Sequence, residues 1–293
     1  MGSRVLTRAQ WRALEASHEQ RADEATAAHR ARRSDHVAHP VEDFLFTYYP
    51  FRPALLRRWH PGAGVLLEDA AGLPRAGWKH YRSVGRDSEL DVAAYLASRS
   101  TTLAFVRELL TATASRPAQL GCFGLHEWAM VYRQTPEEVR HSDWPLRLGN
   151  DGTDEVVEGL QIRCTHFDAF RFYTPPARSL NLLQPTRETQ VALEQPGCLH
   201  AGMDLYKWAM KLAPAVPGDL VLDCFDHARA IRELDMRASP YDLSALGYAP
   251  VRVETPAGRA EYAAAQRGFA ERGQLLRDRL VAAIDAVRAL APA

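Results

Sequence analysis

The sequence predicts a mainly α-helical protein with a few short β-strands, an α+β class with a single compact helical domain. Two observations support this prediction. Long stretches with apolar residues at helical spacing lie at both ends of the chain, and the stretches with strand character are few and short. Neither internal repeats nor a low-complexity linker interrupts the chain. We therefore expect residues 1–36 to form an N-terminal surface helix and residues 37–293 to form one mostly helical domain that contains the functional site.

The composition and the first residues define the broad class of protein. Of the 293 residues, 46% are apolar and 25% are charged, which is typical of a globular protein with a large core. No run of about 18 apolar residues occurs, so we expect no membrane span. The segment from Met1 to Thr7 lacks the apolar stretch of a signal peptide, and the four cysteines are too few for a disulfide framework. These features predict a cytoplasmic location with reduced thiols.

The charge balance argues against a dedicated DNA-binding protein, although a local basic groove is compatible with it. The formal net charge is zero and the isoelectric point is about 7.2, whereas neutralisation of DNA phosphates requires a basic surface. Lysine is rare, with 3 lysines among the 36 basic residues, and Lys207 and Lys211 are spaced one helical turn apart. We therefore treat Lys207 as a candidate substrate-binding residue.

The first part of the chain combines long helices with short strands. Thr7 is the expected N-cap of a helix that extends to about Arg33 and has a thin apolar stripe. Pro40 and the acidic residues that follow it favour a short helix from Val41 to Tyr49. The other elements expected here are short strands at residues 64–68 and 77–82 and one or two helices between residues 87 and 115.

A buried helix is expected from Ala118 to Arg133, because this stretch is apolar nearly all round. His126 and Glu127 are its only ionisable groups before Arg133. Burial of an unpaired carboxylate costs several kcal/mol or raises its pKa. Glu127 therefore needs a cationic partner, a metal ion or a role as a proton carrier, and a purely structural ion pair is equally compatible with the sequence.

The stretch from Ile162 to Tyr173 contains the first of two His/Asp pairs. Its β-branched and aromatic residues favour a strand, in which His166 and Asp168 project from the same face. Such a pair suits a metal ligand beside a carboxylate, or a base with its orienting partner. A helix would instead align His166 with Phe170 and Tyr173, and a His–Asp hydrogen bond that fixes a loop is the structural alternative.

The second His/Asp pair lies in a helix expected from Leu199 to Leu212. The ionisable residues on one side of this helix, at positions i, i+4, i+7 and i+11, are His200, Asp204, Lys207 and Lys211. An exposed, salt-bridged helix face explains this row. A functional role is the alternative, because the helix is unusually rich in Trp, Tyr and Met for a surface helix.

Two further long helices are expected towards the C-terminus. One extends from Leu220 to about Met236, and its apolar stripe ends at Asp235, an acidic residue on the apolar side. Arg237 either pairs with an acid at this helix end or binds an anionic group of a substrate. The last helix extends from Pro256 to Leu290.

No established catalytic motif occurs, but every cysteine is followed by a histidine two to four positions later. The pairs are Cys122/His126, Cys164/His166, Cys198/His200 and Cys224/His227. Imidazoles together with Glu127, Asp168 or Asp204 form a reasonable donor set for zinc or iron. We therefore name His126, His166 and His200 as candidate metal ligands, with zinc or iron as the cofactor.

The same groups also suit a reaction without a metal. His166 with Asp168, the desolvated carboxylate of Glu127, and Lys207 offer a base, an acid and a cation. The aromatic residues expected around them are Tyr48, Tyr49, Trp59, Trp128 and Trp208. Such walls favour a flat, partly apolar substrate such as a nucleobase.

Five segments carry a family resemblance. They are residues 39–49, 59–62, 122–132, 164–172 and 235–242, and they include Trp59-His-Pro-Gly62 and Asp235-Met-Arg-Ala-Ser-Pro-Tyr-Asp242. Together they resemble a group of actinobacterial proteins that often carry the label 3-methyladenine DNA glycosylase. The resemblance implies cleavage of an N-glycosidic bond, with a carboxylate that stabilises the oxocarbenium ion after a base is flipped into an aromatic pocket.

Three functions follow as expectations. The first is an N-glycosyl hydrolase that releases a modified nucleobase, with Glu127, Asp168 or Asp204 as the catalytic carboxylate and His166 assisting. The second is a metal-dependent enzyme that acts on a small molecule through its histidines. The third is a non-catalytic helical protein that binds a ligand or partner in its aromatic groove. The substrate-binding residues expected for the first function are Tyr48, Tyr49, Trp59, Trp128, Lys207 and Arg237.

Overall fold

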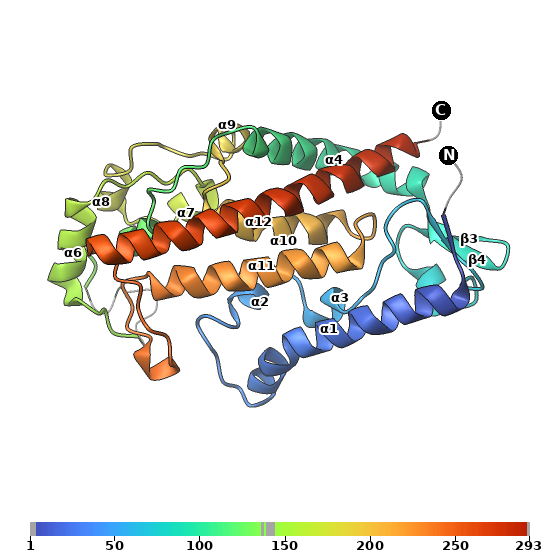
Figure 1. Ribbon diagram of the computed structural model, residues 1–293, viewed down its shortest axis with the longest axis horizontal. Helices are drawn as coiled ribbons and strands as arrows, with labels where there is room; N and C mark the ends of the chain where they lie inside the picture. Colours follow the sequence, from blue (N-terminus) through green and yellow to red (C-terminus); the bar gives the residue numbers. More distant parts are fainter. Residues whose placement is uncertain (1–3, 136–137, 139–143, 292–293) are drawn as a thin grey trace. The chain divides into compact units, whose positions relative to one another are not determined.

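The structure, a computed structural model, describes residues 4–135, 138 and 144–291 (Figure 1). Helices predominate among these residues and the strands are short, which confirms the mainly α-helical class. None of the helices in the described ranges combines the length and the hydropathy that a membrane span requires. The contacts divide the chain into two compact units. Unit 1 comprises residues 1–111, 205–228 and 275–293, and unit 2 comprises residues 112–204 and 229–274.

Unit 1 contains a four-stranded sheet with the strand order β1-β2-β4-β3. The strands are β1 (Arg4–Leu6), β2 (Val65–Leu67), β3 (Tyr81–Val84) and β4 (Asp87–Leu90). β1 pairs with β2 in parallel, with Leu6 opposite Leu67, and the other two pairs are antiparallel. The strand predicted at residues 64–68 is confirmed. The strand predicted at residues 77–82 is wrong over most of its length, because a 3-10 helix (η1, Pro74–Gly77) comes first and β3 begins only at Tyr81.

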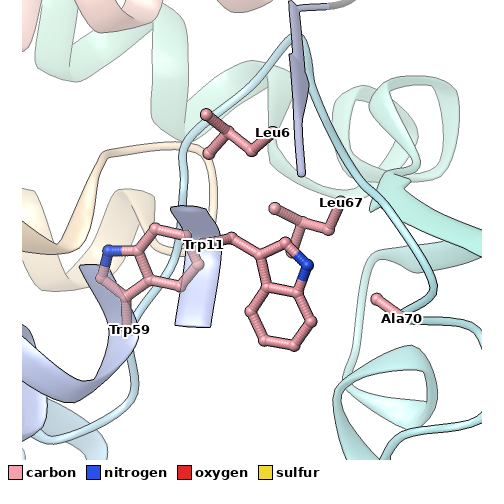
Figure 2. Close-up of a cluster of buried hydrophobic side chains, with 5 residues drawn as sticks. All are labelled: Leu6, Trp11, Trp59, Leu67 and Ala70. Carbon is pink, nitrogen blue, oxygen red and sulfur yellow. The ribbon is translucent and has the colours of Figure 1, made fainter. Parts of the chain in front are cut away.

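Helix α1 (Arg8–Ser34) belongs to unit 1 and begins as the sequence predicts. Thr7 is its N-cap: the Thr7 hydroxyl accepts a hydrogen bond from Gln10 N (3.4 Å), and Gln10 Oε1 accepts one from Thr7 N (3.0 Å). Trp11 is fully buried, and its indole N–H donates to the carbonyl of Glu68 at 2.9 Å. The buried apolar cluster around it, shown in Figure 2, consists of Leu6, Trp11, Trp59, Leu67 and Ala70. One indole ring thus joins α1 to the end of β2.

The other helices of unit 1 enclose an aromatic interior. They are α2 (Phe44–Tyr48), α3 (Pro53–Leu56), most of α4 (Val92–Ala114), and parts of α10 (Leu199–Leu212), α11 (Gly218–Arg237) and α12 (Pro256–Ala289, red in Figure 1). The long helices predicted near the C-terminus are confirmed within a few residues. α4 begins at Val92 rather than at Asp87, because the residues before it form β4. Tyr206 packs edge-on against Tyr49 and Phe225, with ring centroids 5.7 Å and 5.2 Å apart.

Unit 2 consists of short helices joined by loops, together with the remaining parts of α4, α10, α11 and α12. Its short helices are α5 (Leu125–Ala129), α6 (Gly149–Gly159), α7 (Phe167–Phe170), α8 (Pro175–Arg178), α9 (Gln190–Leu193) and the 3-10 helix η2 (Ser244–Leu246). The long helix predicted from Ala118 to Arg133 is wrong, because only α5 forms there. Phe123 and Gly124 have φ values of 45° and 70°, and this left-handed backbone cannot continue into a right-handed helix.

The strand predicted from Ile162 to Tyr173 is also wrong. Ile162 forms only an isolated bridge with Asn181, and the chain then turns into α7. The Asn181 side chain accepts a hydrogen bond from Cys164 N (2.7 Å) and donates one to Cys164 O (3.1 Å), which satisfies the backbone of Cys164 without a neighbouring strand. His166 is the N-cap residue of α7 and Asp168 lies in its first turn, so the two do not share a strand face.

Candidate metal centre

Three buried side chains from three helices converge in unit 2. They are His126 from α5, His200 from α10 and Asp235 from α11, and we call them triad A. Their potential ligand atoms all lie within 4.8 Å of one another. The exposed fractions of the three residues are 6%, 7% and 0%, so the cluster is excluded from bulk water.

The closest contact in triad A lacks the geometry of a hydrogen bond. His126 Nε2 lies 3.0 Å from Asp235 Oδ1, yet neither atom has a hydrogen-bond partner within the described part of the chain. The carboxylate oxygen therefore lies away from the in-plane direction along which the N–H bond or the lone pair of Nε2 points. Two donor atoms that are this close without pointing at each other resemble two ligands directed at one metal ion.

A second buried triad lies beside the first. It consists of His166 at the start of α7, Glu194 directly after α9, and Asp204 from α10, and we call it triad B. His166 Nε2 forms a hydrogen bond with Asp204 Oδ2 at 3.2 Å and lies 3.3 Å from Glu194 Oε1. The potential ligand atoms of triad B also lie within 4.8 Å of one another. A ring nitrogen carries at most one hydrogen, so one imidazole nitrogen between two carboxylates suits a shared cation.

Helix α10 contributes to both triads, because His200 and Asp204 are one turn apart on the same face. The His200 ring lies between the two other imidazoles, with ring centroids 4.4 Å from His126 and 5.4 Å from His166. His200 and Asp204 are 7% and 1% exposed, so the exposed, salt-bridged face predicted for this part of the helix is wrong. The polar row at the start of α10 instead faces the interior of unit 2.

An arginine fixes the carboxylates that surround triad A. Arg232 Nη1 donates to Glu127 Oε1 at 2.9 Å and to Asp235 Oδ2 at 3.3 Å, and all three residues are buried. Glu127 thus has the cationic partner that the sequence required of it. Its Oε1 lies 4.0 Å from His126 Nε2, next to triad A but outside its set of ligand atoms.

The electrostatic environment puts His200 and Asp235 in the protonation state that binds a cation, whereas His126 has to lose its proton when a metal binds. Burial lowers the pKa of His200 well below its ordinary value, and the neighbouring His126 lowers it further. Burial acts in the same direction on His126, but the Asp235 carboxylate more than offsets it and raises the pKa of His126. For Asp235 burial favours the neutral acid, but the His126 ring and Arg232 hold the pKa of Asp235 below its ordinary value. His200 is therefore neutral and Asp235 ionised near pH 7, as ligation requires.

The thiols expected beside the histidines lie next to triad A. Cys122, Cys164 and Cys198 line, together with His126 and His200, a cavity of about 20 Å³, which is the space of about one water molecule. Burial raises the pKa of all three thiols, that of Cys164 to about 11, so they are protonated near pH 7 and poor metal ligands. Three of the four Cys/His pairs in the sequence thus belong to this site, whereas Cys224 and His227 belong to unit 1.

The other predicted site residues of unit 2 lie outside the triads. Asp168 is partly exposed and pairs with Arg171 at 3.3 Å. Arg237 pairs with Glu233 at 3.7 Å and with Glu261 at 3.6 Å. Trp128 is fully buried, and its indole N–H donates to the carbonyl of Ala238 at 2.9 Å. In the structure Trp128 and Arg237 therefore hold neighbouring parts of unit 2 together.

The remaining predicted substrate-binding residues belong to unit 1. Tyr48 and Tyr49 pack against each other, with ring centroids 4.9 Å apart. Trp59 is 5% exposed and lies in the apolar cluster of Figure 2. Lys207 Nζ lies 4.5 Å from the centre of the Trp208 ring.

Sequence reasoning did not select two residues of the triads. Asp235 carried a signal, because an acid at the end of an apolar helix stripe needs a buried partner. Glu194 carried none, since it follows a single helical turn in a loop-rich segment. Comparisons with protein-family models, with curated proteins and with solved structures found no match, so the geometry alone supports any function.

Proposed function

We propose that the protein is a metal-dependent enzyme that acts on a small molecule, with one divalent cation held by triad A and one by triad B. The observation that supports this most strongly is the contact between His126 Nε2 and Asp235 Oδ1 at 3.0 Å without hydrogen-bond geometry. A buried acid and base that served only to stabilise the fold would be expected to hydrogen-bond at this distance.

The distances in both triads match those between ligands of one ion. With metal–ligand bonds of about 2.1 Å, two ligands at right angles are about 3.0 Å apart and two tetrahedral ligands are about 3.4 Å apart. The three nitrogen–oxygen contacts, at 3.0, 3.2 and 3.3 Å, lie within this interval.

The donor types select the class of cation. Imidazole nitrogens and carboxylate oxygens suit zinc, iron or manganese, whereas the protonated thiols beside triad A do not compete for the ion. Each triad supplies three ligands, which leaves coordination positions for water or substrate. A bound cation of this kind supplies a Lewis acid and activates water near neutral pH. Arg232 holds the Glu127 carboxylate in position beside triad A.

Metal analysis of the purified protein tests the proposal. We expect about two equivalents of a transition metal per chain after gentle purification, and about one in Asp235→Asn and in Asp204→Asn, because each variant removes one carboxylate from one triad. His227→Gln is the matched control, since His227 is also buried and also follows a cysteine but belongs to unit 1. Less than about 0.2 equivalents in the wild-type protein, folded by circular dichroism, would overturn the proposal.

Cleavage of an N-glycosidic bond, which the family resemblance implies, stays a prediction. Glu127 and Asp204 are the buried carboxylates for it, and Asp168 is the partly exposed one. Release of free base from alkylated DNA separates the two functions. Base release that survives a chelator and is lost in Glu127→Gln would favour the glycosylase, whereas a protein that holds its metal and releases no base would favour the metal-dependent enzyme.

A further inference from the structure

A cleft beside triad A has the size of a small-molecule pocket. Its volume is about 280 Å³, and its lining includes Gln119, Cys122, Gln161, Arg163 and Gln195. Cys122, Arg163 and Gln195 also line the small cavity that His126 and His200 border. The two spaces therefore share part of their lining. Its volume lies at the lower end of the range for ligand pockets, which favours a small molecule over a polymer.

Arg163 gives this cleft a positive charge. A guanidinium is charged at any pH at which the protein is folded, and it binds a carboxylate or phosphate through two parallel hydrogen bonds. Within the described residues, Arg163 makes no ion pair with a carboxylate. Most other arginines near the site are paired, for example Arg232 with Glu127 and Arg171 with Asp168. Arg163 is exposed, so its donor groups face water and are open to an anionic ligand in the cleft.

Gln119 adds an acceptor to the same cleft. Its Oε1 atom is buried and, within the described part of the chain, has no hydrogen-bond partner. The backbone of Gln119 is held in place, because Gln195 Oε1 accepts hydrogen bonds from Gln119 N (2.8 Å) and from Gly197 N (2.7 Å). Gly197 passes so close that an added Cβ would lie 2.4 Å from the Gln119 carbonyl oxygen. These contacts fix the backbone only, and the Gln119 side chain has to rotate to bring the buried Oε1 atom to the cleft, where it accepts a hydrogen bond from a hydroxyl or amine group of a ligand.

We propose that this cleft binds the substrate and that the substrate is a small organic oxyanion with a hydroxyl or amine group. Arg163 binds the oxyanion, a carboxylate or a phosphate, and Gln119 Oε1 accepts the hydrogen bond from the hydroxyl or amine. The substrate enters past Cys122 and presents its reacting atom to the side of triad A that His126 and His200 form. The inference rests on the proposed metal-dependent function for the role of triad A, but not for the binding of the anion.

Calorimetric titration with three probes tests the inference: inorganic phosphate, acetate and glycolate, each added to the metal-loaded and to the chelator-treated protein. We expect glycolate to bind more tightly than acetate, because only glycolate has a hydroxyl for Gln119. Arg163→Gln should weaken the binding of glycolate at least tenfold, whereas Arg163→Lys should weaken it less. Gln119→Leu should remove the preference for glycolate over acetate. The titration with phosphate shows which oxyanion the cleft prefers.

Arg178→Gln is the matched control, an exposed arginine of unit 2 that does not line the cleft, and it should bind glycolate like the wild type. The inference would be overturned if none of the three probes bound, or if Arg163→Gln left their binding unchanged. Binding that depends on Arg163, in a protein that contains no metal as purified, would support the anion site and contradict the proposed function. Metal content measured on the same sample therefore separates the two failures.

Discussion

Unit 1 and unit 2 both bury charged side chains, but they arrange them differently. In unit 1, Arg75 is 3% exposed, pairs with Glu15, donates to the carbonyl of Trp59 at 2.7 Å and lies 4.8 Å from the centre of the Trp78 ring. In unit 2, Arg232 holds Glu127 and Asp235, yet Asp235 also meets His126 without a hydrogen bond. Burial of charge by itself therefore does not mark a functional site, whereas the convergence of buried histidines and carboxylates indicates one.

The histidines show the same contrast. In unit 1, His18 Nε2 contacts the carbonyl of Leu56 at 2.9 Å, and His60 Nδ1 contacts the hydroxyl of Tyr81 at 3.0 Å, so each ring has one neutral partner. Burial lowers the pKa of His18, and it lowers the pKa of His60 to about 3. In unit 2, three imidazoles lie together with three carboxylates. We interpret the isolated, neutral rings of His18 and His60 as structural. The histidines that lie together with carboxylates in the triads are the ones that we assign to metal binding.

The largest effect that tests this comparison comes from removing a buried arginine in each unit. Arg232→Met removes the arginine that pairs with Glu127 and Asp235, and Arg75→Met removes one of the two arginines that pair with Glu15. We expect each change to lower the free energy of unfolding by about 3–5 kcal/mol, measured by urea denaturation. Only Arg232→Met should raise the affinity of the protein for metal, because it removes a positive charge beside triad A. Equal metal affinities in both variants would contradict the distinction between the units.

Removal of the metal should have the next largest effect. A ligand present at about 100 times its dissociation constant stabilises the folded state by about 2.7 kcal/mol, so chelation should lower the Tm of the wild-type protein by several degrees. The double variant Asp204→Asn/Asp235→Asn should not respond to the chelator, because both triads have lost a carboxylate. An unchanged Tm in the wild-type protein, with metal shown to be removed, would mean that the ions contribute nothing to folding.

The pH dependence of stability should separate the structural histidines from the triads. Because the pKa of His60 is about 3 in the folded protein and about 6.5 in the unfolded chain, its contribution is complete above pH 6.5 and is lost as the pH falls towards 3. The unfolding free energy should fall in this window, and His60→Gln should reduce the slope by at most about 1.4 kcal/mol per pH unit. Denaturation series at pH 7, 6 and 5 measure this slope, and identical slopes in both proteins would exclude His60 as its source.

The smallest effect on the free energy of unfolding is expected from removal of the N-cap of α1. Thr7→Ala removes the hydroxyl that accepts from Gln10 N and should cost about 1 kcal/mol, while Thr7→Ser should restore most of it. Metal content should stay the same in both variants, because Thr7 and the triads belong to different units. A loss of metal in Thr7→Ala would show that a change in unit 1 alters the metal sites of unit 2.

Much of the fold could be predicted because its signals are local. The capping box at Thr7 and the helical spacing of apolar residues in α10, α11 and α12 act within one or two turns, so they are visible in the sequence. The secondary-structure predictions were wrong where a contact with a distant residue, or a left-handed backbone conformation, determines the course of the chain. Asn181 bonds to Cys164 and replaces a strand partner, and the left-handed Phe123 and Gly124 shorten the expected helix to α5.

For the site, the sequence by itself determined which chemistry was available: paired histidines and carboxylates, thiols beside them, and Glu127 in need of a partner. Only the tertiary structure decided how these groups combine. It brought Glu194 and Asp235 into the triads, gave Glu127 to Arg232, and left Asp168 partly exposed. Periodicity predicts which face of an element is buried, because it acts along one element. The partner on that face depends on contacts between residues far apart in the sequence, such as Glu127 and Arg232, which are 105 positions apart.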